Sequence, residues 1–80
     1  MNLGISRVLT VRNQTGGQVR FKLTNPNNGT HNGSISGNGE TMVNSSVFAQ
    51  TVELTYNGVT ITVPYPADGI LTVTEAMFTA

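Results

Sequence analysis

Two runs of alternating apolar and polar residues, separated by an Asn-Gly pair, constrain this chain more than any other feature. Residues 51–56 and 59–65 each carry an apolar side chain at every second position, and Asn57-Gly58 lies between them. Alternation with this period is typical of a strand with one buried face. A type I′ turn needs positive φ at both central residues, so Asn-Gly between two such runs predicts a β-hairpin. Pro64 ends the second strand, because proline cannot donate to a ladder.

Other segments repeat the β pattern. The clearest is Gln18–Thr24, where Val19, Phe21 and Leu23 are expected to point inward and their neighbours outward. Further strands are predicted over residues 3–12, around 34–36, around 42–43 and over 70–75, with residues 76–78 extending the last strand or fraying.

Helix is not expected, because the only candidate segment, residues 74–78, is far shorter than the roughly 12 residues that a marginal helix needs. Six or seven short strands joined by tight turns predict an all-β fold. We expect a small antiparallel β-sandwich, with a small open β-barrel as the alternative. The pattern leaves meander and Greek-key topology equally open.

Length limits how stable such a domain can be. The 80 residues are expected to form one domain over 1–80. A chain of this size buries only about 60 % of the surface that its unfolded form exposes. Small domains compensate with disulfides, metals or oligomerisation, and the sequence contains no cysteine. A homo-oligomer is therefore expected.

The N-terminal residues lack the basic start and the long apolar run of a secretory signal. No stretch approaches the roughly 20 apolar residues that cross a bilayer, so no membrane span is expected. If the chain is full length, we expect it in the cytoplasm or associated with a virion; a trimmed mature chain is the alternative.

Charge is scarce and unevenly distributed. The chain has eight charged side chains and a formal net charge of zero, which argues against nucleic-acid binding. The basic residues precede the acidic ones along the chain: Arg7, Arg12, Arg20 and Lys22, then Glu40, Glu53, Asp68 and Glu75. Either strands from the two halves pair with their charges opposite each other, or the surface is bipolar and suits head-to-tail association.

Catalytic groups are few. The chain has one histidine, one lysine, one aspartate and no cysteine, and no serine lies in a nucleophile motif. His31 lies among glycine and asparagine residues, where an imidazole would be poorly held. Zinc would lack ligands, and Glu40 is the only carboxylate near the Asn-rich segment for calcium. We therefore expect no enzyme activity, no cofactor and no metal.

The segment from Asn25 to Glu40 is the first candidate site. Its Asn-Gly and Asn-Pro turn signals predict a loop, and loops of this length are often functional. Its amides and backbone would hydrogen-bond a carbohydrate, as in a lectin-like module, or a protein partner, as in an inhibitor or effector. The candidate ligand-binding residues are Asn27, Asn28, Thr30, His31 and Asn32.

A threonine-lined face is the second candidate. Six threonines occupy the expected outward positions of the last three strands: Thr51, Thr55, Thr60, Thr62, Thr72 and Thr74. Such a face, with few charges to block strand addition at the sheet edges, suits docking of another copy. The leading hypothesis is a non-enzymatic structural or adhesive module that self-associates, as part of a virion or a bacterial surface assembly.

Overall fold

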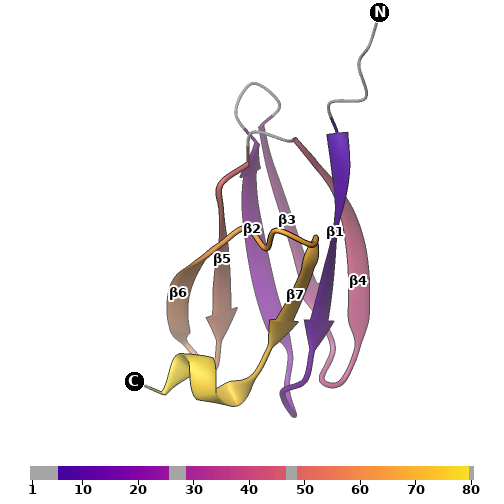
Figure 1. Ribbon diagram of the computed structural model, residues 1–80. Helices are drawn as coiled ribbons and strands as arrows, with labels where there is room; N and C mark the ends of the chain where they lie inside the picture. The colour runs from indigo at the N-terminus through magenta and orange to yellow at the C-terminus, as the bar shows by residue number, and fades with distance from the viewer. Residues whose placement is uncertain (1–5, 26–28, 47–48, 80) are drawn as a thin grey trace, which may run out of the picture.

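Strands dominate the computed structural model, which describes residues 6–25, 29–46 and 49–79. Within these ranges the chain forms seven strands and one short 3₁₀ helix (Figure 1). In chain order they are β1 (Ser6–Asn13), β2 (Val19–Asn25), β3 (Gly29–Ile35), β4 (Glu40–Ser46), β5 (Thr51–Tyr56), β6 (Val59–Pro64), β7 (Ile70–Val73) and η1 (Glu75–Phe78). The first strand was expected to begin at Leu3, which lies outside the described residues.

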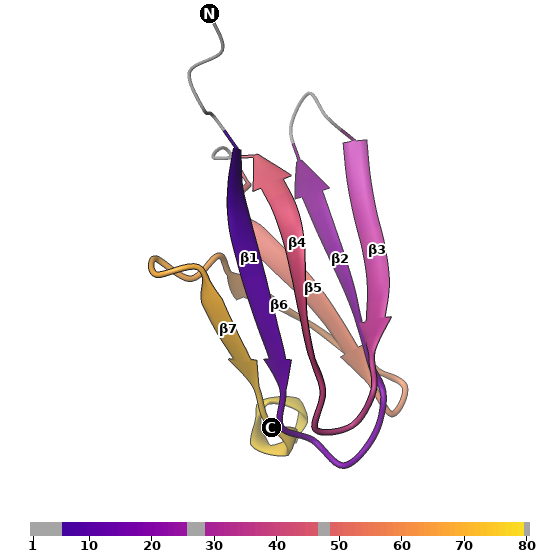
Figure 2. The same ribbon diagram turned by 90° about the vertical axis from the view of Figure 1, so that its right-hand side faces the viewer.

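The strands form two sheets that pack face to face, which confirms the predicted all-β sandwich (Figure 2). One sheet has the order β4-β1-β7 and the other has the order β3-β2-β5-β6. All pairs are antiparallel except β1 with β7, which run parallel. Because β1 pairs with β4 and β2 pairs with β5, the topology is not a simple meander.

The β5–β6 hairpin forms where the Asn-Gly pair predicts it. Asn57 and Gly58 have φ values of 53° and 81°, as a type I′ turn requires. Tyr56 lies opposite Val59 across the turn, and the register continues from Thr55 with Thr60. This confirms the predicted hairpin.

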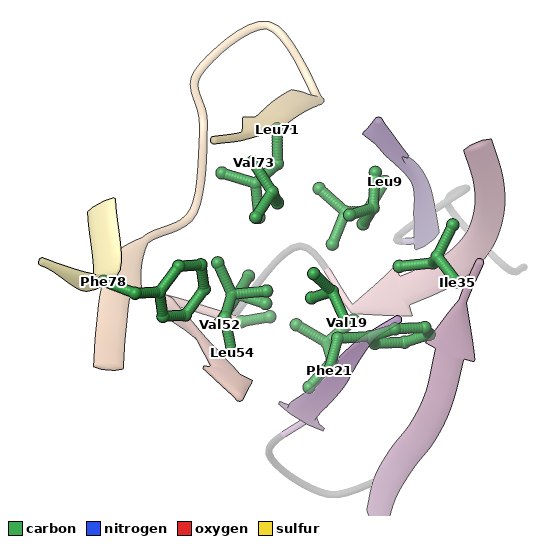
Figure 3. Close-up of a cluster of buried hydrophobic side chains, with 12 residues drawn as sticks. Leu9, Val19, Phe21, Ile35, Val52, Leu54, Leu71, Val73 and Phe78 are labelled. Atoms are coloured by element: carbon green, nitrogen blue, oxygen red, sulfur yellow. The ribbon is translucent and has the colours of Figure 1, made fainter. Parts of the chain in front are cut away.

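Apolar side chains on the inward positions of both sheets meet to form the core (Figure 3). The inward positions of β2 and β5 are the most regular, and their alternation in burial follows the sequence. The buried apolar residues are Leu9, Val11, Val19, Phe21, Leu23, Ile35, Ala49, Val52, Leu54, Leu71, Val73 and Phe78. Each fully buried Val or Leu contributes roughly 1.5–3 kcal/mol through the hydrophobic effect.

A buried amide ties one end of the sandwich together. Asn13, at the end of β1, is 1 % exposed. Its Nδ2 donates to the carbonyl oxygens of Gly17, Ile35 and Ser36 at 2.8, 3.0 and 3.0 Å. Its Oδ1 accepts from the backbone N–H and the hydroxyl of Thr15 at 2.9 and 2.6 Å. One side chain therefore joins β1, the β1–β2 turn and the end of β3.

The prediction of a loop from Asn25 to Glu40 is wrong over most of that segment. Gly29–Ile35 is a regular strand that pairs with the whole of β2, and a tight turn at residues 36–39 leads directly into β4. The sequence pattern does not indicate this strand, because β3 is an edge strand whose residues are almost all exposed. A strand that buries no face shows no apolar alternation.

The C-terminal segment also differs from its prediction. Residues 76–78 neither extend the last strand nor fray, because β7 ends at Val73 and one 3₁₀ turn follows. The N–H of Met77 donates to the carbonyl of Thr74 at 3.2 Å, which closes the turn and buries Phe78. In the part of the chain that the structure describes, no helix has the length and apolar character needed to cross a membrane.

Candidate functional site

The structure separates the residues of the first candidate site. Thr30 and Asn32 lie opposite Thr24 and Lys22 of β2, so their side chains share the outer face of the four-stranded sheet. His31 lies opposite Leu23 and therefore points from the other face of β3. All three residues are exposed. Asn27 and Asn28 lie outside the described residues.

The six threonines of the second candidate do not share one face. Four of them, Thr51, Thr55, Thr60 and Thr62, belong to β5 and β6 and occupy the outer face of the four-stranded sheet. On this face the hydroxyls of Thr55 and Thr60 are hydrogen-bonded at 2.8 Å.

The last two threonines lie elsewhere. Thr72 is in β7, which belongs to the other sheet, and Thr74 lies between β7 and η1. The sequence could not reveal this division, because β7 follows β6 in the chain but pairs with β1.

A shallow depression lies on the outer face of the four-stranded sheet. It has a volume of about 290 Å³ and is lined by the exposed side chains of Arg20, Lys22, Asn32 and Glu53 and by the partly buried Thr55. Lys22 lies between Asn32 on β3 and Glu53 on β5 in the cross-strand register. An amide, an ammonium and a carboxylate therefore lie side by side across this part of the face, and together they offer a polar ligand both donors and acceptors.

Two basic residues face acidic residues across strands. Arg12 lies opposite Glu40, with Nε 3.5 Å from the carboxylate oxygen, and Lys22 lies opposite Glu53. This confirms the cross-strand interpretation of the charge pattern for these two pairs. The Arg12–Glu40 pair is half-exposed, so its contribution to stability is small, at most about 1 kcal/mol.

Arg7 occupies an inward position on β1 that sequence analysis did not explain. Its guanidinium lies 3.7 Å from the centre of the Tyr65 ring and donates to the carbonyl oxygen of Ala49 at 2.8 Å. The Tyr65 hydroxyl is hydrogen-bonded to that of buried Ser45 at 2.6 Å. In the sequence, Arg7 falls on the same alternating positions as the buried Leu9 and Val11, where an apolar residue would be expected. Its contacts give Arg7 a structural role at this end of the sandwich.

A second groove lies between the β5–β6 turn and η1. Its volume is about 330 Å³, and it is lined by Tyr56, Asn57, Val59, Glu75, Phe78 and Thr79. The rings of Tyr56 and Phe78 are 5.3 Å apart at an interplanar angle of 49°. The sequence does not reveal this groove, because η1 brings Glu75 and Phe78 beside a hairpin that is almost 20 residues away in the chain.

Glu75 is held in place within this groove. Its Oε2 accepts from the backbone N–H of Gly16 at 3.1 Å and from the Tyr56 hydroxyl at 3.3 Å. Burial, followed by the negative charge of Glu75, raises the pKa of the Tyr56 hydroxyl above its usual value. The Tyr56 hydroxyl therefore directs its proton at the Glu75 carboxylate.

The four strands at the sheet edges differ in how they are protected against pairing. β6 ends in Pro64 and contacts η1, β4 begins at the charged Glu40, and β7 has only four residues. Over its seven residues, β3 contains no acidic residue, lysine, arginine or proline. Charges, proline and short length are the usual means of blocking strand addition, so β3 is the least protected edge.

Among residues 6–25, 29–46 and 49–79, no three His, Asp or Glu side chains gather closely enough to hold a metal ion. Comparison of the chain with protein-family models, with curated proteins and with solved structures finds no match. The function is therefore inferred from the surfaces described above.

Proposed function

We propose that this protein is a non-enzymatic structural module that associates with copies of itself through the open edge of β3. The observation that carries the proposal is that β3 is a seven-residue strand at the end of its sheet without charge or proline. Its free side presents backbone N–H and C=O groups that another strand satisfies by pairing. We infer that the module is a repeated component of a larger structural or adhesive assembly, as on a virion or a bacterial surface.

A two-fold, antiparallel pairing centred on Asn32 fits this edge. It places Asn32 opposite the partner's Asn32 and Thr30 opposite the partner's Ser34. Amide and hydroxyl side chains form favourable cross-strand pairs, and no like charges face each other directly. The two four-stranded sheets then continue as one sheet across the interface, and the same patch serves both copies, as a two-fold interface requires.

Such an interface is narrow, because it consists of one pair of strands and their neighbouring side chains. Stable protein interfaces usually bury at least about 1,200 Å² in total. We therefore expect a concentration-dependent association, which becomes strong only where several contacts act together in an assembly.

Light scattering coupled to gel filtration, over a range of protein concentrations, tests the proposal. The parent is expected to exceed its monomer mass of 8.5 kDa as concentration rises. Asn32→Glu is expected to remain monomeric, because the new carboxylates face each other across the two-fold. Within one copy the same carboxylate lies opposite Lys22, so the fold gains a favourable pair rather than losing one.

Thr62→Lys is the matched control, because it adds one charge to the other edge strand of the same sheet, opposite Glu53. This variant should self-associate as the parent does. A parent that stays monomeric at all concentrations, or an Asn32→Glu variant that associates like the parent, would refute pairing through β3.

Carbohydrate binding is the second candidate, and the depression that contains Asn32, Lys22 and Glu53 favours it. Its mixture of donors and acceptors matches sugar hydroxyls. A glycan array probed with the parent and with Asn32→Ala tests this function. A signal that depends on Asn32 supports it, and an array without signal for the parent rules it out.

A further inference from the structure

The groove between the β5–β6 turn and η1 differs from the surfaces considered for self-association. It lies at the C-terminal end of the chain, where η1 follows β7 and reaches the β5–β6 hairpin (Figure 1). Of its six lining residues, Glu75 carries a negative charge and none is basic. The charge of the site is therefore set by one carboxylate.

The polar groups of the groove are mainly arranged to accept hydrogen bonds. Both hydrogen bonds of the Glu75 carboxylate are made by Oε2, one from Gly16 and one from Tyr56. The single proton of the Tyr56 hydroxyl is used in that bond, so its oxygen presents lone pairs to a ligand. The side-chain amide of Asn57 and the hydroxyl of Thr79 add further oxygen acceptors.

Apolar surface lies beside these acceptors. Val59 occupies an inward position of β6, opposite Tyr56, but is 42 % exposed because it lines the open groove. The rings of Tyr56 and Phe78 form the adjoining aromatic wall. A short aliphatic chain would bury Val59 surface, and a cation at its end would meet the carboxylate and the edge of an electron-rich ring.

We propose that this groove binds a basic side chain of a partner protein, an ammonium or guanidinium group carried on an aliphatic stem. The Glu75 carboxylate is the counter-ion, the Tyr56, Asn57 and Thr79 oxygens accept the remaining donors, and Val59 contacts the stem. Because Gly16 and Tyr56 already fix the carboxylate, little side-chain entropy is lost when the cation binds.

Titration of the ¹⁵N-labelled protein, followed by NMR, with three capped amino acids tests the assignment. The probes are Nα-acetyl-lysine methylamide, Nα-acetyl-arginine methylamide and the uncharged Nα-acetyl-norleucine methylamide. The two cations are expected to shift the amide resonances of Val59, Glu75 and Thr79, with a dissociation constant of the order of 1 mM for a ligand of this size. Comparison of the lysine and arginine probes shows which cation the groove prefers.

Glu75→Gln should weaken binding of both cations at least about tenfold, since it removes the charge and keeps an oxygen that accepts from Gly16 and Tyr56. Glu53→Gln is the control, because it removes an exposed carboxylate outside the groove and should leave binding unchanged. Equal binding of the norleucine probe, cation-induced shifts confined to other surfaces, or unchanged affinity in Glu75→Gln would each overturn the proposal.

Discussion

Replacing Asn13 with alanine is expected to destabilise the protein more than any exposed substitution on the same strands. The Asn13 amide is 1 % exposed and makes five hydrogen bonds to groups from three segments. Two of its partners keep a donor when the amide is removed: the Thr15 hydroxyl, 2.8 Å from Gly17 O, can turn to that carbonyl, and Gly39 N–H already donates to Ser36 O at 2.9 Å. Asn13→Ala therefore removes one hydrogen-bond partner each from the buried Thr15 N–H and from the Ile35 carbonyl.

An unsatisfied buried polar group costs about 1–3 kcal/mol, and the space left by the amide adds a smaller cavity term. We expect Asn13→Ala to lower the free energy of unfolding by about 3–5 kcal/mol. The total for a domain of this size is only about 4–12 kcal/mol, so the variant approaches the limit of folding. Its Tm should fall by at least about 12 °C.

Urea unfolding followed by far-ultraviolet circular dichroism measures this loss. Asn44→Ala is the matched control, because Asn44 is exposed on β4 and its removal should change stability by no more than about 0.5 kcal/mol. If Asn13→Ala does not fold, Thr15→Ala gives a milder test, with an expected loss of about 1–2 kcal/mol. A loss below about 1 kcal/mol in Asn13→Ala would refute the structural role of this amide.

Two further predictions concern Gly33 and Tyr56. A Cβ at Gly33 would lie 2.6 Å from two ring atoms of Phe21, so Gly33→Ala should lower the free energy of unfolding in urea by about 1–3 kcal/mol. Ser34→Ala, on the exposed face of the same strand, should be nearly neutral. Equal losses in the two variants would contradict the close packing of Phe21 on β3. In a Tyr65→Phe background, where Tyr56 is the only tyrosine, absorbance titration should show a pKa above 10.0 that Glu75→Gln lowers in part, because burial is the larger cause. Since the folded state holds the Tyr56 proton more tightly than the unfolded state, the associated stability is present below pH 10 and is lost as pH rises through the folded-state pKa. An unchanged Tyr56 pKa in Glu75→Gln would contradict the contact between Tyr56 and Glu75.

Strands that bury one face could be predicted from the sequence. In β2 and β5 the buried positions are apolar and the exposed positions polar, so the period of two is visible without a structure. The Asn57-Gly58 turn was equally predictable, because few residues adopt positive φ at both turn positions.

The edge strand and the candidate sites could not be predicted in the same way. β3 is stabilised by its pairing with β2 rather than by burial, so its residues resemble those of a loop. Alternation along the chain predicts which threonines point outward but not which sheet each strand joins, so it cannot separate Thr72 of β7 from the threonines of β5 and β6. The parallel pairing of β7 with β1, and the η1 turn that brings Glu75 to Tyr56, are long-range contacts that periodicity does not encode.

Amide hydrogen exchange at low and high protein concentration tests the central claim, self-association through β3, most directly. If β3 pairs with a second copy, amides of Gly29–Ile35 that face the free edge should become protected as concentration rises. Amides of β6, at the other edge of the same sheet, should keep their exchange rates. Unchanged exchange in β3, or new protection confined to other strands, would contradict the proposal.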